Sequence, residues 1–324
     1  MADATNKLVT VIGGSGFVGR HLVRALAQRG YRIRPAMRRP DLAGHLQPLG
    51  SVGQIMPVQA NVRYPDSVLA ACQGADIVIN LTGILSISGS QTFDAIHVSG
   101  AEASARAAKQ AGANSFIQMS AIGADAGSSS TYARTKAEGE ARAKALFPGA
   151  IIVRPSVIFG PEDDLFNRFA GLARIAPALP LIGGGETLFQ PVFVGDVADG
   201  MSELATHHDR HAGKTFEFGG PVTMSLKQIM EFTLKTTARR RFLAPLPFGL
   251  AKMMAAVLGL LPKPLLTMDQ VELLKSDNIV SEACTADGRT LEGLGISPQG
   301  IESIVPSYLY RYRKAGQFTR TTNA

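Results

Sequence analysis

Cysteine, tryptophan and long apolar runs are all scarce in this sequence. Its 324 residues include two cysteines, no tryptophan and only 6% aromatic residues. Because Cys72 and Cys284 cannot supply the disulfide framework of a secreted domain, we expect a reducing compartment. No stretch reaches the roughly 20 uninterrupted apolar residues of a membrane-spanning helix, since proline and lysine interrupt even the apolar segment 242–266.

Targeting, nucleic-acid and metal signals are also missing. The start of the chain shows neither a secretory leader nor an arginine-rich transit segment, so we expect neither. The formal net charge of +7 favours anionic partners, but the basic residues form no stripe with interleaved aromatics, so we predict no nucleic-acid binding. The six histidines show no metal-ligand spacing with the cysteines, so we predict no metal site.

Short apolar runs alternate with helical patterns over the first half of the chain. We predict strands at 8–12, 31–37, 51–59, 76–81, 115–120 and 150–153, and helices at 17–29, 66–73, 92–111 and 131–146. This alternation predicts an α/β fold with a Rossmann-type doubly wound parallel sheet. Beyond residue 160 proline and glycine become frequent and helices dominate, so we expect a dinucleotide-binding core at 1–160 and a smaller, mostly helical C-terminal lobe at 161–324. One or two strands should return to the sheet within about 190–220, among them Thr215–Phe218.

A glycine-rich loop follows the first predicted strand and opens the first predicted helix. Gly13 permits the tight turn, Gly16 lets the backbone approach a pyrophosphate, and Gly19 allows close helix packing. The helix N-terminus then offers N–H groups and a positive dipole end to phosphates. The cofactor-binding residues predicted here are Gly13, Ser15, Gly16, Phe17, Val18 and Gly19.

The end of the second predicted strand bears on the choice between NAD and NADP. An acidic residue there would bind the ribose 2′-hydroxyl, but the sequence has Arg38 and Arg39. Two guanidinium groups can hold a 2′-phosphate, so we predict NADPH rather than NADH as the cofactor. The alternative is that both arginines are solvated surface residues.

Tyr132 and Lys136 lie four residues apart on the helix predicted after the fifth strand, and therefore on one helical face. A nearby ammonium group favours a phenolate, so such a tyrosine can exchange a proton with a carbinol oxygen while hydride moves to or from a nicotinamide. Lys136 can also hold the nicotinamide ribose. Occupancy by cofactor alone would equally explain both residues.

Together these motifs resemble the extended or atypical short-chain dehydrogenase/reductase superfamily. The finer features resemble one branch, the dehydrogenase-like nucleotide-binding accessory subunit of respiratory complex I (NADH:ubiquinone oxidoreductase) and its bacterial relatives. The segments that carry this resemblance over nearly the whole chain are 13–19, 129–140, 150–163, 190–197 and 242–247.

The resemblance implies a tightly held NADPH and an accessory or assembly role, largely non-catalytic, beside other complex I subunits near the quinone-reduction region. It also implies peripheral attachment at the cytoplasmic side of a bacterial inner membrane, the equivalent of the mitochondrial matrix side. By position in the family pattern, the further cofactor contacts are Asn61, Val62, Leu81, Thr82, Gly83, Ile84, Pro155 and Ser156. The serine that orients the substrate carbonyl in catalytic relatives falls on Ser120 or on Ala121, and Ala121 would leave that site incomplete.

The segment 239–266 indicates a docking surface in the C-terminal third. Arg239–Arg241 precede a predicted apolar helix at 248–261, which at 1.5 Å per residue is too short to span a bilayer. A basic cluster beside an apolar helix fits a membrane-surface or protein contact, while packing within the lobe is the alternative. The aromatic and basic tail Tyr308–Lys314 could lie at the same surface.

Three functions are compatible with these features. The first is the NADPH-binding complex I subunit. The second is an NADPH-dependent reductase or epimerase for a sugar nucleotide or quinone-like substrate, with Tyr132 as acid/base, Lys136 tuning it and Ser120 as polar helper. The third is a sensor of the NADPH/NADP ratio. The near-full-length resemblance favours the first, and the intact Tyr132–Lys136 pair supports the second.

Overall fold

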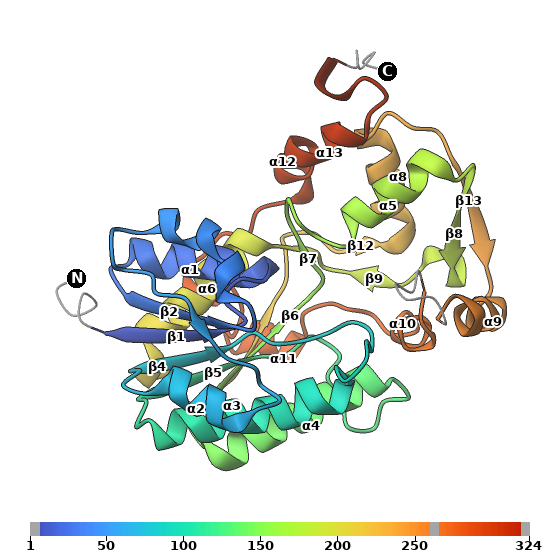
Figure 1. Cartoon of the computed structure of the whole chain (residues 1–324). Coiled ribbons are helices and arrows are strands. Elements are labelled where there is room, and N and C mark those ends of the chain that lie inside the picture. Colours follow the sequence, from blue (N-terminus) through green and yellow to red (C-terminus); the bar gives the residue numbers. More distant parts are fainter. Residues whose placement is uncertain (1–6, 260–265, 319–324) are drawn as a thin grey trace. The chain divides into compact units, whose positions relative to one another are not determined.

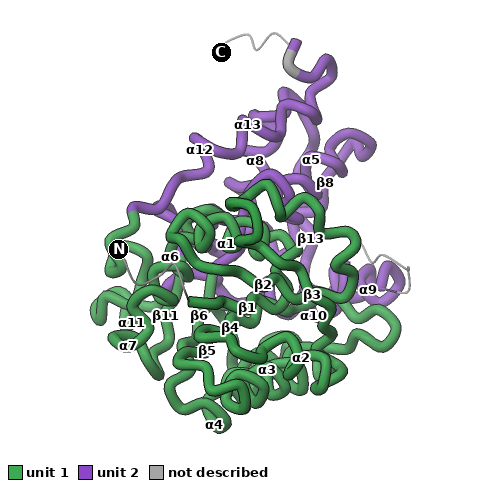
Figure 2. The backbone as a smooth tube through the Cα atoms, turned by 60° about the vertical axis from the view of Figure 1, so that its left-hand side comes forward, with its two compact units in different colours: residues 1–155, 195–218, 281–296 green, residues 156–194, 219–280, 297–324 purple. Residues whose placement is uncertain are grey.

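The chain folds into two compact units in a computed structural model that describes residues 7–259 and 266–318. Unit 1 comprises residues 1–155, 195–218 and 281–296, and unit 2 comprises residues 156–194, 219–280 and 297–324 (Figure 2). The chain passes between the units five times. A single boundary at residue 160 is therefore a coarser division than the structure shows.

Unit 1 is built on a seven-stranded sheet in the order β11-β6-β5-β4-β1-β2-β3, and every pair of neighbouring strands is parallel. Its strands are β1 Leu8–Ile12, β2 Arg32–Met37, β3 Val58–Gln59, β4 Ile77–Asn80, β5 Ser115–Met119, β6 Ile151–Pro155 and β11 Thr215–Phe218. This is the strand order of a doubly wound dinucleotide-binding sheet, extended at one edge by β11. The predicted fold class and the returning strand Thr215–Phe218 are confirmed.

Helices cover both faces of this sheet. They are α1 Phe17–Gln28, α2 Pro65–Cys72, α3 Ser99–Gln110, α4 Thr131–Leu146, α6 Val194–Thr206, α7 His208–His211 and α11 Glu282–Ala286, with short turns η1 Pro40–Leu42, η2 Gly44–Leu49, η3 Asp94–Val98 and η5 Glu292–Leu294. Figure 1 shows α2, α3 and α4 on one face and α1 and α6 on the other. The central strands β1, β4 and β5 are buried along nearly their whole length, which is why they read as continuous apolar runs.

Close helix packing depends on small residues in α3 and α4. Ala101 and Ala105 of α3 are fully buried. A Cβ atom on Gly139 of α4 would lie 2.1 Å from the carbonyl oxygen of His97. Only glycine allows this approach, so the position of α4, which carries Tyr132 and Lys136, is set by a backbone contact.

Two predicted elements differ from the structure. The strand expected at 51–59 is reduced to β3, because Gly53 takes a left-handed turn (φ +76°) that breaks the extended run. The helix expected at 92–111 begins instead with the widened π-type turn η3 before α3 starts. Periodicity alone predicts neither local change.

In its described residues, unit 2 combines helices with three two-stranded ladders. Its elements are β7 Ile158–Phe159, α5 Phe166–Ile175, β8 Ala178–Ile182, η4 Gly183–Gly185, β9 Leu188–Phe189, β10 Val192–Phe193, β12 Met224–Ser225, α8 Leu226–Thr236, β13 Phe242–Leu246, α9 Phe248–Leu258, α10 Met268–Leu273, α12 Ile301–Ile304, α13 Pro306–Leu309, η6 Tyr310–Tyr312 and η7 Gly316–Phe318. The ladders pair β7 with β10 and β8 with β13 in parallel, and β9 with β12 antiparallel. Of the apolar helix predicted at 248–261, α9 covers 248–258, and residues 260 and 261 lie outside the described residues. In the part of the chain that is described, no helix has both the length and the apolar character to cross a bilayer.

Candidate cofactor site

The glycine-rich loop forms a tight turn between β1 and α1. Gly13 is left-handed (φ +85°), and its N–H donates to Ala36 O of β2 at 2.8 Å. A Cβ atom on Gly19 would lie 2.5 Å from the carbonyl oxygen of Gly13, so α1 approaches the turn too closely for any side chain. Gly16, the exposed residue before α1, has no side-chain cap, and the first turn of the helix carries no acidic residue. The loop therefore presents uncapped N–H groups to a phosphate.

Gly14 is a loop residue that the sequence analysis did not single out. A Cβ atom there would lie 2.8 Å from Cβ of Pro35 on β2. Val18 is buried beneath the loop, while Ser15 and Phe17 are half-buried. Glycine is required here because of the side chain of Pro35 on β2, a contact that the spacing of the motif does not reveal.

The strip Leu81–Ile84 lies beside the loop at the carboxyl end of β4. A Cβ atom on Gly13 would be 3.5 Å from both the carbonyl carbon of Leu81 and Cγ2 of Thr82. The buried Asn80 holds this strip, because its Oδ1 accepts from N and Oγ1 of Thr82 at 3.1 and 2.7 Å. Its Nδ2 donates to Gln118 Oε1 at 2.9 Å. Sequence reasoning missed Asn80 and Gln118, which sit in apolar strands.

The two predicted phosphate-binding arginines follow β2 and are both exposed. Arg39 forms a two-pronged ion pair with Asp41, which raises the pKa of Arg39 by hydrogen bonding and charge. Arg38 donates to the neutral amide of Gln91 at 2.8 Å. Of these two guanidinium groups, Arg38 is therefore the one without a carboxylate partner among the residues that the structure describes.

Asn61 and Val62 follow β3, the next strand of the sheet. The side-chain Oδ1 of Asn61 accepts from Arg63 N at 3.1 Å, while its own N–H donates to Ser67 Oγ at 3.0 Å. These bonds fix the turn and leave the amide NH₂ of Asn61 as the group that can donate to a base. Val62 is buried and meets α3 at Gly100.

Tyr132 and Lys136 lie on one face of α4 as predicted, and Lys136 Nζ is 5.8 Å from the centroid of the Tyr132 ring. Lys136 is 6% exposed, and burial lowers the pKa of its ammonium group to about 8 against the opposing effect of Glu140. Gly83 lies against this group, since a Cβ there would be 3.1 Å from Nζ. A buried ammonium for which the described residues show no hydrogen-bond acceptor is suited to hold the oxygens of a ligand.

The carboxylate of Glu140 forms its hydrogen bonds with Arg154 rather than with Lys136. Arg154 of β6 donates to both its carboxylate oxygens at 2.8 and 2.7 Å and lies 3.9 Å from Glu217 of β11. Glu217 in turn accepts from Ser281 N at 2.8 Å. This buried network ties α4 to the sheet edge and to the segment 281–296.

The remaining predicted residues end β5 and β6. Ser120 is 2% exposed, and its Oγ has no hydrogen-bond partner among the described residues. Ala121 follows it and is half-buried. Pro155 closes β6 in unit 1 and accepts from Ile122 N at 3.0 Å. Ser156 begins unit 2, where its hydroxyl group donates to the backbone and side-chain oxygens of Asn278.

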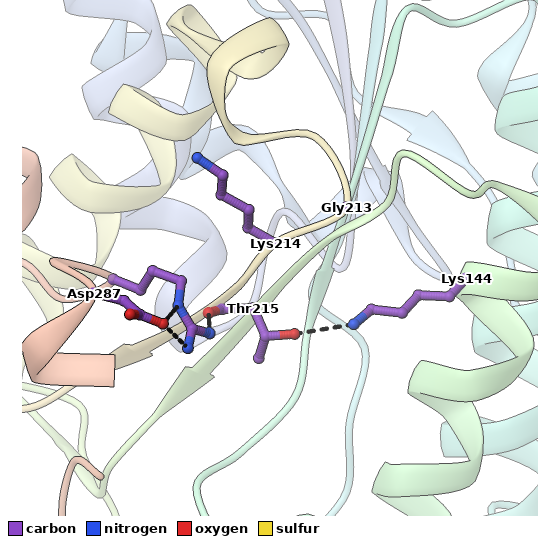
Figure 3. Close-up of a pocket in the computed structure, with 6 residues that line it drawn as sticks. Lys144, Gly213, Lys214, Thr215 and Asp287 are labelled. Carbon is purple, nitrogen blue, oxygen red and sulfur yellow. Dashed lines mark hydrogen bonds and ion pairs between the residues drawn. The ribbon is translucent and has the colours of Figure 1, made fainter. Parts of the chain in front are cut away.

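A separate pocket of about 530 Å³ lies at the opposite, amino end of the sheet in unit 1. Lys144 Nζ donates to Thr215 Oγ1 across it at 3.0 Å (Figure 3). Arg289 donates to Asp287 and to the backbone oxygen of Thr215. Its polar groups largely satisfy one another, and the loop and strand ends described above lie at the other edge. Among the residues that the structure describes, no cluster of three or more His, Cys, Asp and Glu side chains is placed to hold a metal ion.

Known proteins resemble this chain over most of its length. The sequence profile of the NAD dependent epimerase/dehydratase family matches residues 9–219. A mouse protein, NADH dehydrogenase (ubiquinone) 1 alpha subcomplex subunit 9, mitochondrial, is 36% identical over 316 residues, which cover 96% of this chain and 82% of that protein. A ceramide reductase from Caulobacter vibrioides is 36% identical over 182 residues, 56% of each chain. The crystal structure of gox2253 has a TM-score of 0.71 at 21% identity, covering 97% of this chain and 100% of that one, and shares the fold.

The strand order and the loop geometry, together with the profile match, define a Rossmann-type NAD(P)-binding protein of the NAD dependent epimerase/dehydratase family. Within that class, the chain belongs to the family of the complex I accessory subunit known as alpha subcomplex subunit 9. The resemblance inferred from the sequence motifs is confirmed.

Proposed function

We propose that this protein is an NADPH-binding accessory or assembly subunit of respiratory complex I, in which the cofactor is mainly structural. The observation that carries the proposal is the 36% identity to the mouse subunit across 96% of this chain. Similarity of that extent includes unit 2, which a shared nucleotide-binding core alone would not require.

A tightly held cofactor would stabilise unit 1 by mass action. A ligand that binds only the native state adds about 3–4 kcal/mol at 100- to 1,000-fold excess over its dissociation constant. The uncapped loop before α1, the strip Leu81–Ile84 and the buried ammonium of Lys136 are the groups we assign to it. They lie at the carboxyl edge of the sheet, where dinucleotides bind in this fold.

Arg38 supports the choice of NADPH over NADH. No acidic residue ends β2, and Arg38 is paired with an amide rather than a carboxylate, so its charge can serve a 2′-phosphate. We expect Arg38→Gln to weaken NADPH binding by about 10- to 100-fold while changing NADH affinity less than twofold. Arg39→Gln is the matched control, since its guanidinium is held by Asp41. Equal affinity of the wild-type protein for both cofactors would contradict the assignment.

The surface of α9 supports a docked role beside other complex I subunits. Ala251 and Ala255 pack inward, whereas Leu250, Met253, Met254 and Val257 are 41–67% exposed on one helical face. Lys252, the only charged residue of α9, forms an ion pair with Glu272 of α10. An uncharged face of large apolar side chains is typical of an interaction site.

The neighbouring basic cluster, Arg239–Arg241, contributes fewer free guanidinium groups to this surface than its sequence indicates. Arg239 donates to Tyr312 O and Arg241 to Ala173 O, both at 2.9 Å, so two of the three arginines hold unit 2 together. Burial and two neighbouring arginines lower the pKa of Arg239. Arg240 is exposed and is the one available for an anionic surface.

The tail also packs differently from the expected arrangement. Tyr308 is buried, and its hydroxyl donates to Asp163 at 2.5 Å. Arg311 and Tyr312 both bind Oδ1 of Asn167 on α5. The aromatic tail is therefore used within unit 2, and the proposed docking surface is the α9 face with Arg240.

We place the assembled protein peripherally, at the cytoplasmic side of a bacterial inner membrane near the quinone-reduction region, with a membrane-surface contact through 239–266. The part of this segment at 260–265 lies outside the described residues. The test is a native pull-down of the tagged protein from its own membranes in mild detergent, with the released nucleotide identified. Recovery of complex I subunits with stoichiometric NADPH is the expected result. A free protein that exchanges nucleotide readily would overturn the accessory role.

A double variant tests the docking surface in the same experiment. Met253→Ser with Val257→Ser should reduce recovery of complex I subunits at least tenfold, while the retained NADPH stays unchanged. Leu42→Ser, an exposed apolar residue of unit 1 that is 66% accessible, is the matched control. Unchanged recovery with the double variant would rule out this face.

The second candidate function is an NADPH-dependent reductase or epimerase. Tyr132 and Lys136 keep their mutual geometry, and the buried Ser120 Oγ has no partner in the described part of the chain, as expected of a group that awaits a substrate oxygen. Similarity to a ceramide reductase adds a lipid carbonyl to the sugar-nucleotide and quinone-like candidates. Tyr132→Phe would then lower turnover about 10²- to 10⁴-fold. For the structural role, the same variant should leave assembly and NADPH content intact.

A further inference from the structure

His97 is a buried histidine that belongs to none of the motifs discussed above. It lies on the widened turn η3 that precedes α3, and it is 3% exposed. Nothing in its sequence context distinguishes it from the other five histidines, because it has no metal-ligand spacing. Its surroundings nevertheless place it between two parts of the candidate cofactor site.

Hydrogen bonds on both ring nitrogens fix the state of this histidine. Nε2 accepts from the backbone N–H of Ile84 at 3.1 Å, so this nitrogen carries no proton. Nδ1 lies 3.1 Å from Thr135 Oγ1 and is therefore the protonated nitrogen of a neutral ring. Burial, assisted by the Lys136 ammonium group, lowers the pKa of His97 to about 3. The ring is neutral across the physiological range.

Two aromatic rings also contact the imidazole. Phe93 stacks on it with ring centroids 5.4 Å apart and an interplanar angle of 26°. Tyr132 meets it edge to face at 5.2 Å and 90°. The imidazole thus contacts α4 through Thr135 and Tyr132, and contacts the strip after β4 through Ile84. It fixes the distance between these two elements.

Gly83 is the point at which these contacts converge. A Cβ atom on Gly83 would lie 3.1 Å from Lys136 Nζ and 3.8 Å from His97 Nε2. In a sheet of this strand order the adenosine half of a dinucleotide lies over β2, and the nicotinamide half lies on the side of β4 and β5. The residues that His97 joins are therefore those of the nicotinamide half.

We infer that His97 is a positioning residue for the nicotinamide half of the cofactor, acting as a neutral spacer that sets the strip Gly83–Ile84 against Tyr132 and Lys136. This inference rests on the proposed cofactor binding and goes beyond it, because it assigns one half of the ligand to one buried side chain. It requires no charge on His97, because a positive ring would be repelled by the neighbouring Lys136 ammonium group.

Two variants separate the contacts of the ring. His97→Gln keeps an acceptor near the position of Nε2 and can still receive the Ile84 N–H. His97→Asn keeps a polar group near Nδ1 for Thr135 and loses the bond to Ile84. His45→Gln, on the exposed turn η2, is the matched control.

Two probes separate the halves of the ligand. NADPH occupies the whole site, whereas 2′,5′-ADP carries only the adenosine half with its 2′-phosphate. We expect His97→Asn to weaken NADPH binding about tenfold or more and to change the affinity for 2′,5′-ADP less than twofold. His97→Gln should lose less than His97→Asn, and His45→Gln should match the wild-type protein.

The outcomes distinguish this inference from the proposed function. Equal losses for both probes, or no loss of NADPH affinity, would overturn the positioning role. Wild-type protein that binds neither probe would overturn the cofactor assignment itself. Far-ultraviolet circular dichroism shows whether His97→Asn folds. If it does not, the alternative variant is Thr135→Val, at a half-buried position, which removes the partner of His97 Nδ1. It should show the same selective loss of NADPH affinity.

Discussion

The two units leave different kinds of group unsatisfied. Unit 1 buries the ammonium group of Lys136 and the hydroxyl group of Ser120, and Ser120 Oγ has no hydrogen-bond partner among the described residues. Unit 2 exposes neighbouring apolar side chains on one helical face, among them Met253 and Val257 on α9. A buried polar group is satisfied by a small polar ligand, whereas an exposed apolar face is satisfied by a macromolecular surface. The contrast indicates that the chain binds in two chemically different ways.

The largest effect should come from the loop in unit 1. Gly19→Ala places a Cβ atom 2.5–2.6 Å from backbone atoms of Gly13 and Gly14, so the loop or α1 must move. We expect NADPH affinity to fall at least 100-fold and the free energy of unfolding to fall by about 3 kcal/mol. Fluorescence titration with NADPH and urea denaturation measure the two effects.

The matched control lies in a helix of unit 2. Gly171 of α5 has no atom within 4 Å of a built Cβ and no positive φ. Gly171→Ala should therefore stabilise the protein by about 0.5–1 kcal/mol and leave NADPH binding unchanged. Near-normal NADPH binding by Gly19→Ala would mean that the loop is less constrained than its contacts indicate.

Tyr308→Phe tests the interior of unit 2. Burial raises the pKa of Asp163, while hydrogen bonds from Tyr308, Asn167 and Gly160 partly offset that effect. Removing the Tyr308 hydroxyl leaves a buried carboxylate with one donor fewer, which should cost about 1–3 kcal/mol of the free energy of unfolding. NADPH binding should stay as in the wild-type protein. Tyr310→Phe, at a residue 41% exposed, should change neither quantity, and equal stability of the two variants would contradict the role of this bond.

Lys136→Met should lower the affinity for NADPH and raise the free energy of unfolding at neutral pH. Because burial lowers the pKa of Lys136 in the folded protein to about 8 from its ordinary value of 10.5, its ammonium group destabilises the cofactor-free protein at neutral pH. The unfolded chain binds more protons between pH 8 and pH 10.5, so this group makes stability rise with pH there, by at most about 1.4 kcal/mol per pH unit. Lys136→Met should remove that rise, increase stability at pH 7 and abolish tight NADPH binding.

The difference between wild type and variant is the quantity to measure, by urea denaturation at pH 7, 8, 9 and 10. Burial raises the pKa of Cys72 to about 12 from 9.0, so this thiol makes stability fall with increasing pH above about 9 in both proteins. Subtraction cancels that contribution. A pH profile that is identical in the two proteins would show that Lys136 is not buried as an ammonium group.

The smallest effect on stability should come from the α9 face. Met253→Ser and Val257→Ser alter side chains that are 64% and 67% exposed, so each should change the free energy of unfolding by less than about 0.5 kcal/mol. Ala255→Leu, at a position 1% exposed, should destabilise by about 1–3 kcal/mol through overpacking. Comparable losses from all three would mean that the α9 face is already covered within the chain.

Much of unit 1 could be predicted because its signals are local. The bounds of β1, α4 and β11 agree with the structure, since each is a short apolar run or a helix with a clear start, such as Ser130 capping Ala133 N. Gly14 and Gly139 escaped prediction because each meets an atom distant in sequence, Pro35 or the carbonyl of His97. His97 itself has no motif, and its role depends on contacts that only the fold brings together.

Unit 2 was less predictable because its contacts depend on tertiary packing rather than on local sequence. A basic run such as Arg239–Arg241 looks solvated in sequence, but whether a guanidinium meets water or a carbonyl oxygen depends on tertiary packing. The strand β13 pairs only with β8, which begins 64 residues earlier. Its proline-rich sequence gave no strand signal of its own.

The interleaving of the two units has a consequence for synthesis on the ribosome. The first 155 residues supply six of the seven sheet strands, whereas β11 emerges only after residues 156–194 of unit 2, and the segment 281–296 only after most of unit 2. At 5–20 residues per second, the chain from residue 155 to Ser281 takes roughly 6–25 s to make, so Glu217 of β11 receives the Ser281 N–H only after that delay. Until β11 emerges, roughly 3–13 s after β6, the strand β6 is an uncovered edge, open to pairing with another chain. A nascent chain of this kind is a natural client for a chaperone, and its assembly is expected to finish after translation.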